Sequence, residues 1–95
     1  MSDRLGTVAL MWQAHLRAPF PRANVGAVEM VMVDADIAGC VSVWLDNGGH
    51  LDAGRRSVLA DRLDDLDAVL PLLAGHARDY YRRLRDLAEL IKPGN

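Results

Sequence analysis

Apolar residues recur at alternating spacings of three and four along most of this 95-residue chain, and breaks rich in proline or glycine divide the pattern into four segments. Because an α-helix turns once every 3.6 residues, this spacing places the apolar side chains of each segment on one helical face. The pattern therefore predicts an all-α fold, a small bundle of about four helices in which residues 1–95 form a single helical domain. A chain of this length can bury a core without disulfides or metal ions.

The first predicted helix covers residues 3–17. It ends before Pro19 and Pro21, because proline lacks an amide hydrogen and pushes the preceding residue out of the helical region. Phe20, between these prolines, is a candidate hydrophobic plug in a loop over residues 18–24. The predicted inward face consists of Leu5, Val8, Ala9, Trp12 and Leu16.

The third and fourth segments predict a C-terminal pair of helices. Asp52 precedes the third segment, where its carboxylate can accept hydrogen bonds from the free amides of the first turn, and Pro71 ends or kinks that helix. The fourth helix covers residues 76–92 and is closed by Pro93 and Gly94. Because only a few residues join the two helices, we expect an antiparallel helical hairpin. Its apolar faces are Val58, Leu59, Leu63, Leu66, Val69 and Leu70, and Tyr80, Leu84, Leu87, Ala88 and Ile91.

The middle segment, residues 25–47, supports two interpretations. As a helix, it presents six apolar residues at spacings of three and four, and Asn47-Gly48-Gly49 ends it in a left-handed turn. As strands, its β-branched residues favour a two-stranded hairpin at 27–46 in an α+β fold, although such a hairpin is marginal on its own. The helical spacing runs through the whole segment, so we favour the helix. Its apolar residues are Met30, Val33, Ile37, Cys40, Val41 and Trp44.

This middle helix is apolar almost all round, since Val28, Met32 and Val43 lie opposite its main face. Such a helix is either buried on all sides or faces a partner, so we expect an interaction or accessory protein that self-associates or binds another protein. A second candidate surface is acidic. Asp61, Asp64 and Asp65 lie on the outer side of the third helix, where they keep the chain in solution or dock a basic partner.

An alternative function is that of a small enzyme or ligand-binding protein. It requires a pocket around Asp34, Cys40 and Trp44, with Trp12 and His15 nearby. Asp34 falls at the edge of the core-facing stripe, and a carboxylate there must be paired or hydrated. Such a pocket depends on whether these residues converge in space.

Motifs that carry known chemistry are incomplete in this chain. Asp34-Ala35-Asp36 partly matches a calcium loop, but the mid-loop ligand and the bidentate carboxylate are missing. The three histidines lack the paired spacing of a zinc site, and Cys40 has no catalytic signature around it. No glycine-rich phosphate loop is present. We therefore expect no catalytic residue, no metal ion and no cofactor.

The net charge of −2 argues against a dedicated nucleic-acid binder. Arg78, Arg82 and Arg85 form a basic stripe on the outside of the fourth helix, but we expect ion pairs four residues apart to neutralise it. The expected pairs are Asp79–Arg83, Arg82–Asp86 and Arg85–Glu89.

The prediction of cellular location depends on two missing sequence signals, for a membrane span and for secretion, and on the single cysteine. No apolar stretch is long enough to span a membrane, and the chain begins without the basic and apolar run of a signal peptide. A single thiol, Cys40, fits a reducing compartment. We therefore expect a cytoplasmic protein with no membrane contact.

The run from Val33 to Cys40, followed by the helix that contains Tyr80 and Tyr81, resembles small actinobacterial proteins of unassigned activity. The resemblance covers about a third of the chain and implies a bacterial source. Because that group has no assigned activity, the resemblance implies no catalytic or binding residues.

Overall fold

The computed structural model describes residues 4–21 and 30–92, which fold into four α-helices and one short 3₁₀ helix. The elements are α1 (Arg4–Arg17), α2 (Met30–Asp46), α3 (Ala53–Val69), η1 (Leu70–Leu72) and α4 (Gly75–Ile91). The described residues contain no strand, so the all-α prediction is confirmed and the hairpin alternative is wrong for residues 30–46. Residues 25–29 of the predicted middle helix, Val28 included, lie outside the described residues.

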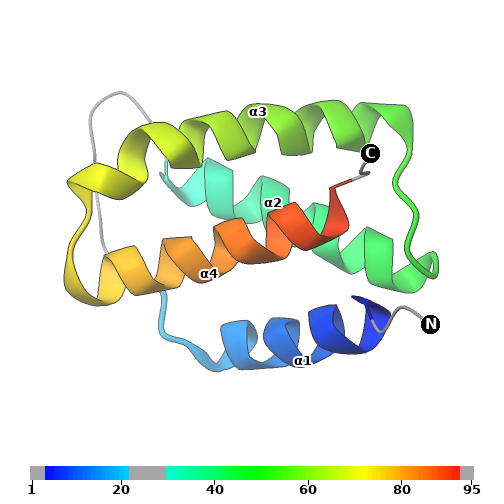
Figure 1. Cartoon of the computed structure of the whole chain (residues 1–95), viewed down its shortest axis with the longest axis horizontal. Helices are drawn as coiled ribbons and strands as arrows, with labels where there is room; N and C mark the ends of the chain where they lie inside the picture. Colours follow the sequence, from blue (N-terminus) through cyan, green and yellow to red (C-terminus); the bar gives the residue numbers. More distant parts are fainter. Residues whose placement is uncertain (1–3, 22–29, 93–95) are drawn as a thin grey trace.

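Consecutive helices run in opposite directions, and α4 crosses in front of α2 with α3 and α1 on either side (Figure 1). α4 packs against the other three helices, whereas α1 and α3 do not touch each other within the part of the chain that is described. A turn through Leu73 and Ala74 joins η1 to α4, so the predicted antiparallel hairpin at the C-terminal end is confirmed.

The helices begin and end where their local chemistry predicts. The carboxylate of Asp52 accepts a hydrogen bond from the backbone amide of Arg55 at 3.3 Å and caps α3. After α2, Gly48 and Gly49 have φ angles of +67° and +102°, which glycine adopts without strain. Pro71 lies within η1 and ends the regular hydrogen bonding of α3.

The core between the helices is almost entirely apolar. A fully buried leucine contributes about 1.5–3 kcal/mol to folding, against about 0–1 kcal/mol for an exposed ion pair. Packing of these apolar side chains therefore holds the bundle together. The largest fully buried side chains are Tyr81, Ile37, Leu59, Leu66, Leu84, Leu87, Val8, Val33 and Val41.

The inward face of α1 differs from the prediction. Val8 is buried and Trp12 is partly buried, as expected, but Leu5 and Leu16 are 46% and 63% exposed. His15 takes the buried position instead. The reason is that α1 packs against α4 and α2 but not against α3, so that only a narrow face is covered.

The inward face of α2 is the predicted one, since all six of its expected core residues are buried. Met32 is 50% exposed and Val43 is half-buried, so the opposite side of α2 is only partly covered by this chain. None of the described helices combines the length and the apolar character needed to cross a membrane.

Candidate functional site

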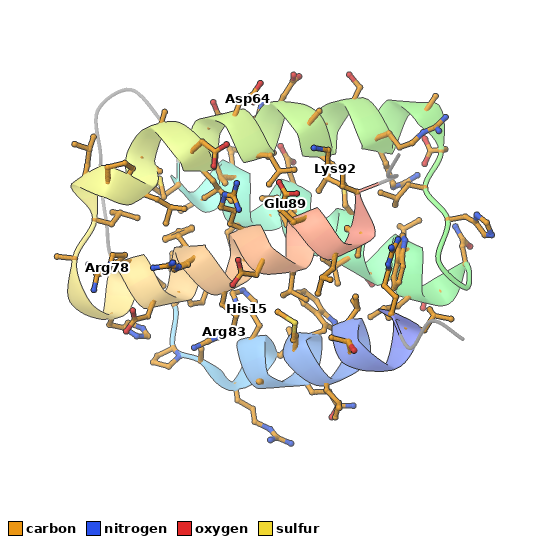
Figure 2. The ribbon with its side chains drawn as sticks, in the orientation of Figure 1. His15, Asp64, Arg78, Arg83, Glu89 and Lys92 are labelled. Carbon is orange, nitrogen blue, oxygen red and sulfur yellow. The ribbon has the colours of Figure 1, made fainter. Side chains whose placement is uncertain are left out.

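A polar cluster joins three helices inside the bundle. α1 contributes His15, α2 contributes Asp34 and α4 contributes Tyr80. The hydroxyl of Tyr80 donates to Oδ1 of Asp34 at 3.0 Å, and Nε2 of His15 lies 3.7 Å from the same oxygen. The imidazole also packs on the Tyr80 ring, with centroids 4.4 Å apart, in the space between α1 and α4 (Figure 2).

His15 is the buried polar residue of this cluster. Its side chain is 3% exposed, and neither of its ring nitrogens has a hydrogen-bond partner among the described residues. Burying a polar group without a hydrogen bond costs about 1–3 kcal/mol. The carboxylate of Asp34, which is 21% exposed, lies just beyond hydrogen-bond distance, so a small movement of either side chain would satisfy the imidazole.

The two tyrosines near Asp34 have hydroxyl pKa values above the ordinary value for tyrosine. Burial, together with the hydrogen bond to Asp34, raises the pKa of Tyr80. Burial and, to a lesser extent, the charge of Asp34 raise the pKa of Tyr81 to about 12. The hydroxyl of Tyr81 donates to the carbonyl of Met30 at 3.3 Å. Both tyrosines are therefore neutral hydrogen-bond donors at physiological pH.

An imidazole beside a carboxylate is also the arrangement of a general base and its orienting group. Within the described residues, however, no hydroxyl or thiol is hydrogen-bonded to His15, and no three metal-binding side chains lie together. The contacts support a structural task for this cluster, because they tie α1 to α2 and α4.

Three of the five predicted pocket residues meet at this cluster. The rings of Trp12 and His15 stack with centroids 5.9 Å apart, and His15 in turn faces Asp34. Tyr80, which was predicted only as a core residue, completes the group. A buried tyrosine hydroxyl needs an acceptor, and this requirement is the sequence signal that could have linked it to Asp34.

Cys40 and Trp44 lie elsewhere. The thiol of Cys40 donates to the carbonyl of Arg55 at 3.6 Å, and burial raises its pKa. Trp44 lies at the far end of α2, where a Cβ on Gly49 would come within 3.4 Å of its ring. Among the described residues, neither Cys40 nor Trp44 forms a hydrogen bond, ion pair or ring contact with Trp12, His15 or Asp34, and the thiol has no histidine partner there.

The described residues line a larger and a smaller groove on the surface. The larger one, of about 430 Å³, lies between the end of α3, η1 and α4, and the smaller one, of about 120 Å³, lies beside Trp44 and His50. Neither includes His15, Asp34 or Cys40. The larger groove, called the arginine groove below, is lined by Asp67, Leu70, Pro71, Arg78, Arg82, Arg85 and Asp86.

The predicted ion pairs on α4 form only in part. Arg85 lies 3.7 Å from Glu89 and also 2.6 Å from Asp67 of α3, a contact that no helical spacing predicts. In the described part of the chain, no carboxylate lies within 4.0 Å of Arg82 or Arg83. The two expected pairs that do not form are Asp79–Arg83 and Arg82–Asp86.

Most exposed residues on the side of α2 that faces away from the core are uncharged. The carboxylate of Asp36, which is 32% exposed and lies 3.9 Å from Arg62 of α3, is at the edge of this side. The exposed residues of this side recur at helical spacing. We call this surface the α2 outer face; it consists of Val31, Met32, Ala35, Gly39, Ser42 and Asp46. The half-buried Val43 borders it rather than lying at its centre.

The acidic residues of α3 are partly paired within the chain. Asp65 lies 3.3 Å from Arg62, whereas Asp61 and Asp64 are exposed. Asp64 points away from the bundle (Figure 2). The acidic surface is therefore narrower than the sequence predicts.

Comparisons with models of protein families, with curated proteins and with solved structures found no match to this chain. The function is therefore inferred from the residues and their geometry.

Proposed function

We propose that this chain is a small helical interaction protein that self-associates through the α2 outer face. The observation that carries the proposal is the lack of charge there, since Asp46 is the single charged residue among six. Val31 and Met32 are 65% and 50% exposed. The water-facing side of a helix is ordinarily polar or charged, so this composition supports contact with another apolar surface.

Gly39, at the centre of the α2 outer face, supports close packing of a second helix. Glycine inside a helix costs about 1 kcal/mol relative to alanine. No described residue requires this glycine, because a Cβ on Gly39 would meet none of their atoms within 4 Å. A missing side chain at this position does, however, let another backbone approach.

A second copy of the chain fits this face. Its stripe, residues 32, 35, 39, 42 and 46, is nearly symmetric about Gly39, so two copies of α2 can pair antiparallel with the glycines at the crossing. Asp46 then lies near the beginning of the second copy's α2, which has no acidic residue in its first turn. Because helix N-termini carry partial positive charge, each Asp46 gains a favourable neighbour.

Such a dimer is expected to be weak and cytoplasmic. One pair of helix faces is smaller than the standard interface of about 1,200–2,000 Å², so we expect dissociation in the micromolar range. The described Cys40 is a free, buried thiol, which suits a reducing compartment.

Sedimentation equilibrium across micromolar concentrations tests the proposal. The unaltered chain should shift from monomer to dimer as its concentration rises. Met32→Asp and Val43→Asp should weaken this association more than Asp64→Ala, because Asp64 lies on α3 outside the α2 outer face. Met32 is more exposed than Val43, so Met32→Asp should disturb folding less. Weaker association of this variant can then be assigned to the surface itself.

A strict monomer at all concentrations would contradict the proposal. So would equal dissociation constants for Met32→Asp and Asp64→Ala, provided that circular dichroism shows both variants to be helical. Met32→Asp and Val43→Asp add the same negative charge. A difference between their dissociation constants therefore reports the position of the substitution and not the change in net charge.

A further inference from the structure

Two arginines of the arginine groove form no ion pair with the described residues. Arg78 and Arg82 are exposed on α4, and no carboxylate of the described residues lies within 4.0 Å of either. Arg85, by contrast, is held in place by Asp67 at 2.6 Å. Figure 2 shows Arg78 beside the turn that leads from η1 into α4.

The charges that line this groove favour an anion. Three arginines outnumber the two aspartates, Asp67 and Asp86, and Asp67 is already paired. Arg78 and Arg82 are four residues apart on one helix, an arrangement in which like charges repel by a few tenths of a kcal/mol. An anion bound between them would relieve this repulsion.

The part of the groove that η1 lines is apolar. It is formed by Leu70 and Pro71 of η1. The groove's volume of about 430 Å³ lies within the range of about 300–1,000 Å³ that small-molecule sites occupy. The groove therefore combines a positively charged side with an apolar side at the size of a small ligand.

We propose that the arginine groove binds a small organic phosphate monoester. Arg78 and Arg82 hold the phosphate, and the organic group lies on Leu70 and Pro71. Four residues along a helix span about 6 Å, and the three terminal oxygens of a phosphate can accept hydrogen bonds from two guanidinium groups at once. A carboxylate has only two oxygens, which one guanidinium fork already satisfies.

A long polyanion fits this surface less well. The neighbouring outer side of α3 carries the exposed carboxylates of Asp61 and Asp64, and the whole chain has a net charge of −2. These charges repel an extended nucleic acid, whereas a single phosphate is small enough to bind at Arg78 and Arg82 without reaching Asp61 or Asp64.

Isothermal titration calorimetry with phenyl phosphate, inorganic phosphate and a single-stranded oligonucleotide tests this site on the full chain. We expect phenyl phosphate to bind more tightly than inorganic phosphate. Arg78→Gln and Arg82→Gln should each weaken phenyl phosphate binding about tenfold, since a charge-assisted hydrogen bond is lost. Arg83→Gln, on the same helix but outside the groove, removes the same charge and should leave the affinity unchanged.

Three results would overturn the proposal. The first is no heat of binding with phenyl phosphate at millimolar concentration. The second is an equal loss in Arg82→Gln and Arg83→Gln, which would indicate a general charge effect. The third is tighter, steeply salt-dependent binding of the oligonucleotide, which would indicate a polyanion surface instead.

Discussion

α2 and α4 are both 17 residues long, pack against each other, and each bury six residues in the same core. Their outer sides differ. Five of the seven exposed residues of α4 are charged, against one of six in α2. The inner faces of the two helices meet the same requirement, which is to exclude water. The outer face of α4 is suited to water and ions, and that of α2 is suited to another protein surface.

The largest effects are expected on the shared inner side. Ile37→Ala in α2 and Leu84→Ala in α4 should each lower the free energy of unfolding by about 2–5 kcal/mol, because both residues are fully buried and leave cavities. Val31→Ala, on the exposed side of α2, should change it by less than about 0.5 kcal/mol. Urea denaturation at low protein concentration measures all three. Similar changes in the free energy of unfolding for Leu84→Ala and Val31→Ala would contradict the distinction between inner and outer faces.

The next largest effect is the pH dependence of stability that arises from Tyr81, on the inner face of α4. An unfolded tyrosine loses its proton near pH 10, whereas Tyr81 in the folded chain has a pKa of about 12. Between these values the unfolded chain binds fewer protons, so the free energy of unfolding falls as pH rises, by at most about 3 kcal/mol. Below pH 10 this contribution is fully present. Denaturation measured at pH values from about 9 to 12 should show a shallower fall for Tyr81→Phe than for the unaltered chain, and equal falls would contradict the assignment.

A smaller effect is expected where the inner faces of α2 and α4 meet through polar groups. Asp34→Ala leaves the Tyr80 hydroxyl without its acceptor and should cost about 1–3 kcal/mol. Tyr80→Phe removes only the donor and should cost about 1 kcal/mol. A double-mutant cycle should give a coupling of at least about 0.5 kcal/mol between the two residues. Additive costs would mean that this hydrogen bond contributes nothing to stability.

The sequence predicts which segments are helical and which faces of α2 and α4 turn inward, but it does not predict the rotation of α1. Prolines, glycines and spacing are local signals, and they mark both ends of α3 and α4 and the C-terminal end of α2 to within about two residues. Burial of Leu16 or His15 in α1 depends instead on how many neighbouring helices cover it, which no local pattern records. The contact between Asp34 and Tyr80 joins residues 46 positions apart and depends on packing in the same way.

The separation of Asp34 from Cys40, by contrast, follows from helical geometry. Asp34 and Cys40 are six residues apart on α2, and six steps of 100° place them on opposite edges of its inner face. Asp34 accordingly meets α4, and Cys40 meets the first turn of α3. A single pocket that includes both residues would have to extend across the buried face between them.

The central claim is that the α2 outer face is built to meet a second copy, and Gly39→Leu tests it most directly. Leucine favours the helix, and a Cβ at this exposed position meets no atom of the described residues within 4 Å, so the monomer should unfold no more easily than before. The added side chain would, however, hold a second helix away from the face. Ala60→Leu, at an exposed position of α3, is the matched control.

Sedimentation equilibrium should give a dissociation constant at least about tenfold higher for Gly39→Leu than for the unaltered chain, a change of about 1.4 kcal/mol, with Ala60→Leu unchanged. An unchanged dissociation constant for a folded Gly39→Leu chain would contradict the account.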